Sequence, residues 1–218
     1  GMALLCFLAH GETPIAEEFG DTVERAMRWL APKVPVTGGR PSGYTNGMAT
    51  YAIAEAYGMT RNGSMDVGFA RDAMDRGLKH IIAGQQDSGG FDYAYAKGER
   101  WDLSVVGWQC QALKAGYNAG SEVSGIKQAM KKSANFVRNV TYNQGHFGYS
   151  SKPAQNAEPS NMSGIGALIL QLLENRRNAF SEAAVGKILI ERLPGYKFNN
   201  SSGSLYGWYY DTQAAFNS

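Results

Sequence analysis

The chain has 218 residues, of which 44% are hydrophobic and 18% charged, and its formal net charge is +2 at pH 7. This composition is typical of a folded globular protein and excludes a disordered one, and the small net charge gives no electrostatic footprint for nucleic acid. No apolar run approaches the roughly 20 residues of a membrane span, so we expect neither a nucleic-acid partner nor a membrane-spanning segment.

The N-terminal stretch GMALLCFLAHGE has a helical pattern from its first position, with no capping residue before it. It lacks the basic segment of a secretory signal peptide. The length suits one large domain or two small ones, and we expect a single domain over residues 1–218, excised from a longer protein. A targeting segment could lie outside this range, so the sequence predicts no localisation.

Both cysteines, Cys6 and Cys110, occur in apolar helical stretches. Free cysteine is among the most buried residue types, so we expect two buried thiols. A single disulfide between them is the alternative.

Four segments carry apolar residues at steps of three and four, which predicts amphipathic helices with one buried stripe each. Asp21 and Glu24 have the spacing of a capping box at the start of the first segment, and Ser121 is a candidate cap for the third. The stripes consist of Val23, Ala26 and Leu30; Val67, Ala70, Met74, Leu78 and Ile81; Val123, Ile126, Met130, Ala134 and Val137; and Phe180, Ala184 and Ile188.

Helices of a second kind alternate with these amphipathic segments. Residues 47–58, 105–116 and 163–174 are apolar nearly all round. A helix that is apolar on every face is buried on every face, so these three segments are expected to form an inner layer.

The buried segments share a register. Gly1-Met2-Ala3 recurs identically as Gly47-Met48-Ala49, and three further glycines begin matching segments at intervals of roughly 50 residues, a period that marks stacked helical hairpins. These glycines either let inner helices approach one another closely or are helix-start residues with no special role. The three are Gly107, Gly164 and Gly207.

The connectors repeat as well. GGFDY (89–93) and GHFGY (145–149) both give Gly-x-Phe-x-Tyr after an amphipathic segment, and we favour packing over ligand binding for their aromatic residues. Residues 33–43 and 151–160 are loops by their Pro, Gly and Ser content. No segment favours a strand over a helix, so the predicted class is all-α.

Alternating buried and amphipathic helices with Gly-aromatic connectors resemble the α/α-toroid of terpenoid cyclases and protein prenyltransferases, in which an outer ring of helices wraps an inner one. The pattern His80-Ile81-x-x-x-Gln85-x-x-x-Gly89-x-Phe91 is similar to the QW motif of squalene and hopene cyclases, with Phe91 in the place of Trp.

The chain more closely resembles the bacterial prenyltransferase and squalene oxidase repeat proteins, a largely uncharacterised group. The matching segments are MATYAIAEAYGMT, DLSVVGWQCQALKAG, NMSGIGALI and YYDTQAAF, in this order, and they cover most of the chain. The resemblance implies an α/α-toroid but no particular activity, because a fold does not fix a function.

The catalytic motifs of the related enzymes are absent from the sequence. There is no DxDD, and Asp72-Ala-Met-Asp75 has the wrong spacing on a helix face expected to be solvated. The D-x-C element of zinc prenyltransferases, the Cys-Gly-Glu-Gln of thioester domains and the G-x-S-x-G elbow are also missing. The three histidines show no ligand spacing. We therefore expect no metal site and no cofactor.

Polar and aromatic side chains gather near the starts of the buried helices. If those helices run parallel, their N-termini meet at one rim, which would attract anions. Capping is the alternative, and it accounts for Asp102 and Asn161. A carboxylate inside a buried helix is costly, so Glu55 either has a partner or faces a lumen. The candidate ligand-binding residues are Tyr51, Glu55, Trp108, Gln111, Tyr209 and Tyr210.

These observations predict an incomplete α/α-toroid of about five inner and four outer helices, either open or completed by missing segments of the parent protein. The missing motifs favour a ligand-binding or scaffold module without catalysis, with a hydrophobic or sugar-like small molecule in a central cavity. The alternatives are an enzyme acting on an isoprenoid-like lipid and a carbohydrate-active toroid enzyme. The latter needs two carboxylates in one cleft, and the candidate pair is Asp102 and Asp211.

Overall fold

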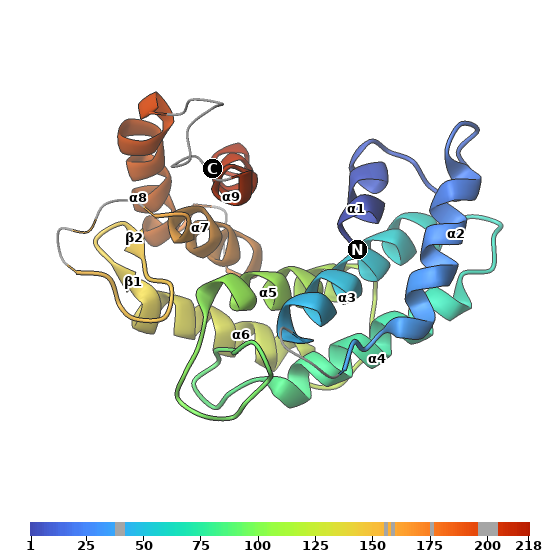
Figure 1. The fold of residues 1–218 in the computed structure, drawn as a ribbon, viewed down its shortest axis with the longest axis horizontal. Helices are drawn as coiled ribbons and strands as arrows, with labels where there is room; N and C mark the ends of the chain where they lie inside the picture. The colour runs from blue at the N-terminus through green and yellow to red at the C-terminus, as the bar shows by residue number, and fades with distance from the viewer. Residues whose placement is uncertain (38–41, 155–156, 158–159, 175–176, 196–204) are drawn as a thin grey trace.

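The computed structural model describes residues 1–37, 42–154, 157, 160–174, 177–195 and 205–218 (Figure 1). Over these residues the regular structure comprises nine α-helices, four short 3-10 or π turns and two short strands, which confirms the all-α class. The predicted loops at 33–43 and 151–160 lie partly outside the described residues. The short turns span Ala31–Lys33, Val137–Thr141, Ile188–Arg192 and Leu193–Gly195.

The helices form two curved layers that follow an arc, with α1 and α2 at one end and α8 and α9 at the other (Figure 1). Consecutive inner helices pack side by side, and each outer helix lies against its inner neighbours. The inner helices are α1 (Met2–Ala9), α3 (Ser42–Thr60), α5 (Leu103–Asn118), α7 (Met162–Leu173) and α9 (Leu205–Phe216). The outer helices are α2 (Gly20–Leu30), α4 (Gly68–Gly84), α6 (Ile126–Phe136) and α8 (Ala179–Lys187).

Burial follows the two predicted helix types. Every residue of α5 from Leu103 to Leu113 is buried, and so is every residue of α7 from Met162 to Gln171. Only one side of the helix α4 is buried, the side that carries its apolar stripe, as the spacing of its apolar residues predicts. α1 and α9 are the exceptions among the inner helices, because they stand at the two ends of the row. Only Leu4 and Leu8 of α1, and four of the 12 residues of α9, are buried.

Neighbouring inner helices run in the same direction. Gly43 of α3 faces Val105 of α5, and Gly58 near the end of α3 faces Ala119, which follows α5. Contacts that advance together along both helices require a parallel pair. The N-termini of α3 and α5 therefore lie at one edge of the inner layer.

The glycines of the shared register mark the close approaches between these helices. A Cβ at Gly47 would lie 2.7 Å from the Gln109 side chain on α5, and a Cβ at Gly107 would lie 2.9 Å from Ile165 on α7. At Gly164 a Cβ would meet the Asp211 carboxylate and, 2.6 Å away, the backbone amide nitrogen of Asp211 on α9. The structure thus favours close helix packing over an incidental helix-start role.

The connector phenylalanines are packing residues, as predicted, whereas the connector tyrosine Tyr149 is 45% exposed. Phe91 and Phe147 are fully buried. In the QW-like segment, Gln85 donates from its side-chain nitrogen to the Ala129 carbonyl of α6 at 2.9 Å and to the Ser133 hydroxyl at 3.0 Å. This segment therefore ties the outer helix α4 to the outer helix α6.

The second connector contains a short hairpin that was not predicted from the sequence. β1 (Tyr142–Asn143) pairs antiparallel with β2 (His146–Phe147). The turn residues Gln144 and Gly145 both have positive φ, 48° and 87°, which is the geometry of a two-residue hairpin turn.

Two of the predicted helix caps are wrong. α2 begins at Gly20, because the Gly20 amide already donates to the carbonyl of Ala16, and Asp21 therefore lies inside the first turn. α6 starts after Gly125, whose left-handed conformation (φ 89°) directs the chain into the helix. Ser121 instead donates to the Asp75 carboxylate at 2.6 Å.

Candidate functional site

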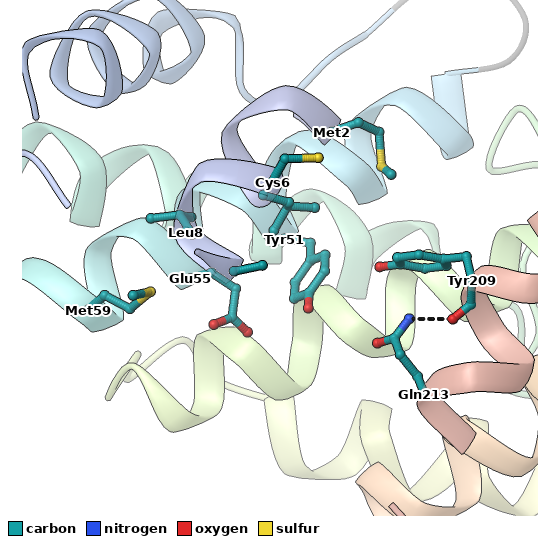
Figure 2. Close-up of a pocket in the computed structure, with 10 residues that line it drawn as sticks. Met2, Cys6, Leu8, Tyr51, Glu55, Met59, Tyr209 and Gln213 are labelled. Carbon is teal, nitrogen blue, oxygen red and sulfur yellow. Dashed lines mark hydrogen bonds between the residues drawn. The ribbon is translucent and has the colours of Figure 1, made fainter. Parts of the chain in front are cut away.

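A pocket of about 440 Å³ opens between α1, α3 and α9. Figure 2 shows α1 on one side, Tyr51 and Glu55 on α3, and Tyr209 and Gln213 on α9. The lining therefore joins the first and last helices of the described chain. Its ten residues are Met2, Leu5, Cys6, Leu8, Ala9, Tyr51, Glu55, Met59, Tyr209 and Gln213.

α1 supplies an apolar wall and one thiol. The helix is apolar on nearly all sides and buries only Leu4 and Leu8, so several of its aliphatic side chains, Leu8 among them, line the pocket. Cys6 is free and exposed at this wall, so its predicted burial is wrong, since α1 has an inner neighbour on one side only. Cys110 is buried and free, as predicted, and its burial raises the pKa of that thiol to about 12.

Aromatic rings form the wall opposite α1. Tyr209 stacks on Trp108 of α5 with ring centroids 5.7 Å apart, and Tyr51 lies tilted against the same indole at 6.4 Å. Trp108 is almost fully buried and does not line the pocket, whereas both tyrosines do. The space between Trp108 and the α9 tyrosines is thus filled, and Trp108 acts as the support of the aromatic wall.

A small hydrogen-bond network behind the wall orients Tyr209. The Tyr209 hydroxyl donates to the Gln111 side-chain oxygen at 3.5 Å, and the Gln111 side-chain nitrogen contacts the Tyr210 hydroxyl at 3.4 Å. Tyr210 is fully buried. Of the six predicted ligand-binding residues, Tyr51, Glu55 and Tyr209 therefore line the pocket, and Trp108, Gln111 and Tyr210 lie behind it.

Glu55 gives the pocket its charge. Among the described residues, none donates a hydrogen bond to its carboxyl or forms an ion pair with it, and burial raises its pKa above the ordinary value. Burial, and then the negative charge of Glu55, raise the pKa of Tyr51. Glu55 therefore faces the pocket and has no protein partner within the described part of the chain.

The two acids of the proposed carbohydrate site have structural partners. Asp102 is the N-cap of α5 and accepts from the Ser104 amide at 3.0 Å, so its predicted capping role is confirmed. Asp211 lies in the middle of α9 and forms a buried ion pair with Arg192 at 2.9 Å. Neither acid lines the pocket. Asn161 precedes α7 but makes no side-chain capping bond there, so its predicted capping role is also wrong; its side-chain oxygen accepts from Arg192 at 3.0 Å.

Replacement of Asp102 by alanine is expected to lower the free energy of unfolding by about 1 kcal/mol, because α5 loses its side-chain cap. Asp102→Asn should retain most of that stability, since asparagine caps as well as aspartate. Urea denaturation of the two variants measures the difference. Unchanged stability in Asp102→Ala, together with loss of ligand binding, would contradict the capping role.

A tyrosine cluster at the N-terminal edge of the inner helices was only partly foreseen. The Tyr44 hydroxyl of α3 donates to the Tyr206 hydroxyl of α9 at 3.1 Å, so these two helix starts also lie together. The Tyr93 and Tyr149 hydroxyls of the two connectors are 2.5 Å apart. The matching tyrosine of each Gly-x-Phe-x-Tyr connector was the available signal for this second pair.

No family model, curated protein or solved structure matches the chain. Within the described part of the chain, no group of three or more His, Cys, Asp or Glu side chains could hold a metal ion. None of the described helices combines the length and apolar character needed to cross a lipid bilayer.

Proposed function

We propose that this protein is a ligand-binding module that holds a small, largely apolar molecule in the pocket between α1, α3 and α9. The two curved helical layers support its interpretation as an incomplete α/α-toroid, with the pocket on the inner side of the arc. The resemblance to prenyltransferase and squalene oxidase repeat proteins points in the same direction.

The pocket itself is the observation that carries this proposal. Its volume, about 440 Å³, falls within the range of small-molecule sites, and it combines aliphatic and aromatic walls with a few polar groups. Such walls favour an apolar chain or ring system, and the polar groups would fix its orientation. A scaffold protein with a filled interior would not need this opening.

An enzyme acting on an isoprenoid-like lipid is the second candidate. The observation that favours it is Glu55, a carboxyl group in a largely apolar pocket with a raised pKa, because a proton donor needs such an environment. The carbohydrate alternative receives no such support, since Asp102 and Asp211 lie outside the pocket lining.

Binding of the neutral fluorophore N-phenyl-1-naphthylamine tests the proposed function. The wild-type protein should bind it saturably at one site per chain, with increased fluorescence. Cys6→Trp should weaken this binding by about tenfold, because the indole would occupy the pocket from its exposed wall.

Ala3→Trp is the matched control, since Ala3 is an exposed residue of α1 outside the lining. Its affinity for the fluorophore should equal that of the wild type. Equal binding by both variants and the wild type would place the fluorophore elsewhere and contradict the proposal.

A further inference from the structure

We propose that the ligand is an organic cation with an apolar tail, whose positive head group lies between the Glu55 carboxylate and the faces of Tyr51 and Tyr209. This inference rests on the proposed function and narrows it to a chemical class. The apolar wall of α1 would hold the tail.

The charge of the lining residues determines which sign of charge the ligand should carry. Glu55 is the one carboxylate among the ten lining residues, and none of them is lysine, arginine or histidine. A partly buried carboxylate without a donor is unfavourable. A cationic head group would supply the missing charge, and an anionic one would add repulsion.

The groups around Glu55 leave this charge uncompensated. Tyr51 on α3, Tyr209 on α9 and Cys6 on α1 are the other titratable residues of the lining, and each is neutral or negative. Beyond the pocket, His10 pairs with Glu12 at 3.3 Å, and Lys114 of α5 lies over the Tyr117 ring at 5.9 Å. Neither residue forms an ion pair with Glu55 in the described structure.

The aromatic wall is suited to the same head group. Aromatic faces attract organic cations, and an ammonium enclosed by several rings and a carboxylate is a recurring arrangement. Tyr51 and Tyr209 both rest on Trp108, so their positions are fixed before a ligand arrives. Figure 2 shows Glu55 and Tyr51 extending in the same direction from α3, with Tyr209 facing them from α9.

The test compares three probes with the same eight-carbon tail: octyltrimethylammonium, octanol and octanoate. Isothermal titration at pH 7.5 should show octyltrimethylammonium binding about tenfold more tightly than octanol, with octanoate weakest. Glu55→Gln should remove this preference while octanol still binds. Glu182→Gln, an exposed position on α8 with the same change of charge, should behave like the wild type.

The pH dependence provides an independent readout, because octyltrimethylammonium does not titrate. Its affinity requires ionised Glu55, so it should fall as the pH is lowered through the pKa of Glu55. Since burial raises that pKa, the fall should begin above the pH expected for an ordinary glutamate. Glu55→Gln should abolish this dependence.

Equal affinities for octanol and octyltrimethylammonium in both the wild type and Glu55→Gln would overturn the cation proposal. Strongest binding of octanoate would overturn it as well. In each of these cases the proposed function would survive if N-phenyl-1-naphthylamine still bound and Cys6→Trp still weakened it. Failure of all four probes would overturn both proposals.

Discussion

Replacement of Phe91 by alanine is expected to lower the free energy of unfolding by about 3–5 kcal/mol. The Phe91 ring is fully buried in the connector between α4 and α5, where it packs edge-on against Tyr95 at 6.3 Å. The smaller side chain would lose this burial and leave a cavity that the surrounding helices cannot fully close. Urea denaturation followed by circular dichroism measures the change.

Phe216→Ala is the matched control for this effect. The Phe216 side chain is 88% exposed at the end of α9, so the same substitution there should change stability by less than about 0.5 kcal/mol. A loss of stability in Phe91→Ala as small as that in Phe216→Ala would show that Phe91 is not a core residue.

Replacement of Gly164 by alanine should destabilise the protein by about 1–3 kcal/mol or more. The added methyl group would lie 2.6 Å from the Asp211 amide nitrogen and 2.7 Å from the Tyr210 carbonyl carbon. Because these atoms are backbone, α7 and α9 would have to separate. The same denaturation experiment measures the loss.

Gly186→Ala makes the same chemical change on the outer helix α8, where a Cβ meets no atom within 4 Å. Alanine is the better helix former, so this variant should be about 0.5–1 kcal/mol more stable than the wild type. The two substitutions should thus have opposite signs. If Gly164→Ala also increased stability, close packing at the shared glycine register would be refuted.

The helical layers could be predicted because a buried helix needs apolar residues on every face, and such residues can be recognised in the sequence. The continuous apolar run around Val105 and Val106 has no polar face, and it forms a helix with no exposed face. The repeated glycines were visible in the sequence as well, but their role depends on the neighbouring helix. Only the distances from Gly47, Gly107 and Gly164 to the neighbouring inner helix distinguish close packing from an ordinary helix start.

Helix ends were harder to predict, because competing local bonds decide them. Asp21 has the right chemistry for a cap, but the backbone bond from Gly20 to Ala16 starts α2 earlier. Ser121 is likewise a good capping residue whose hydroxyl is used by Asp75 on another helix. Neither competitor can be recognised from residue type alone.

The pocket was predicted only in part, since apolar residues look the same in a core and in a pocket wall. Tyr51, Glu55 and Tyr209 were candidates because they combine aromatic or acidic groups with buried helices. Cys6 was not a candidate, because its helix is apolar on nearly every side, as a fully buried helix is. Its exposure follows from the position of α1 at the end of the row, which requires the tertiary structure.

The position of the pocket couples binding to the shape of the whole chain. Each inner helix packs mainly on its immediate neighbours, and α1, at one end of the row, is held from one side. α9, at the other end, also contacts α3 through Tyr206 and α5 through Tyr209. A ligand that contacts both α1 and α9 would connect the two ends of the inner layer, because its binding energy is lost whenever either helix moves away from it. Occupancy would then link α1 to α9 and stabilise their relative positions.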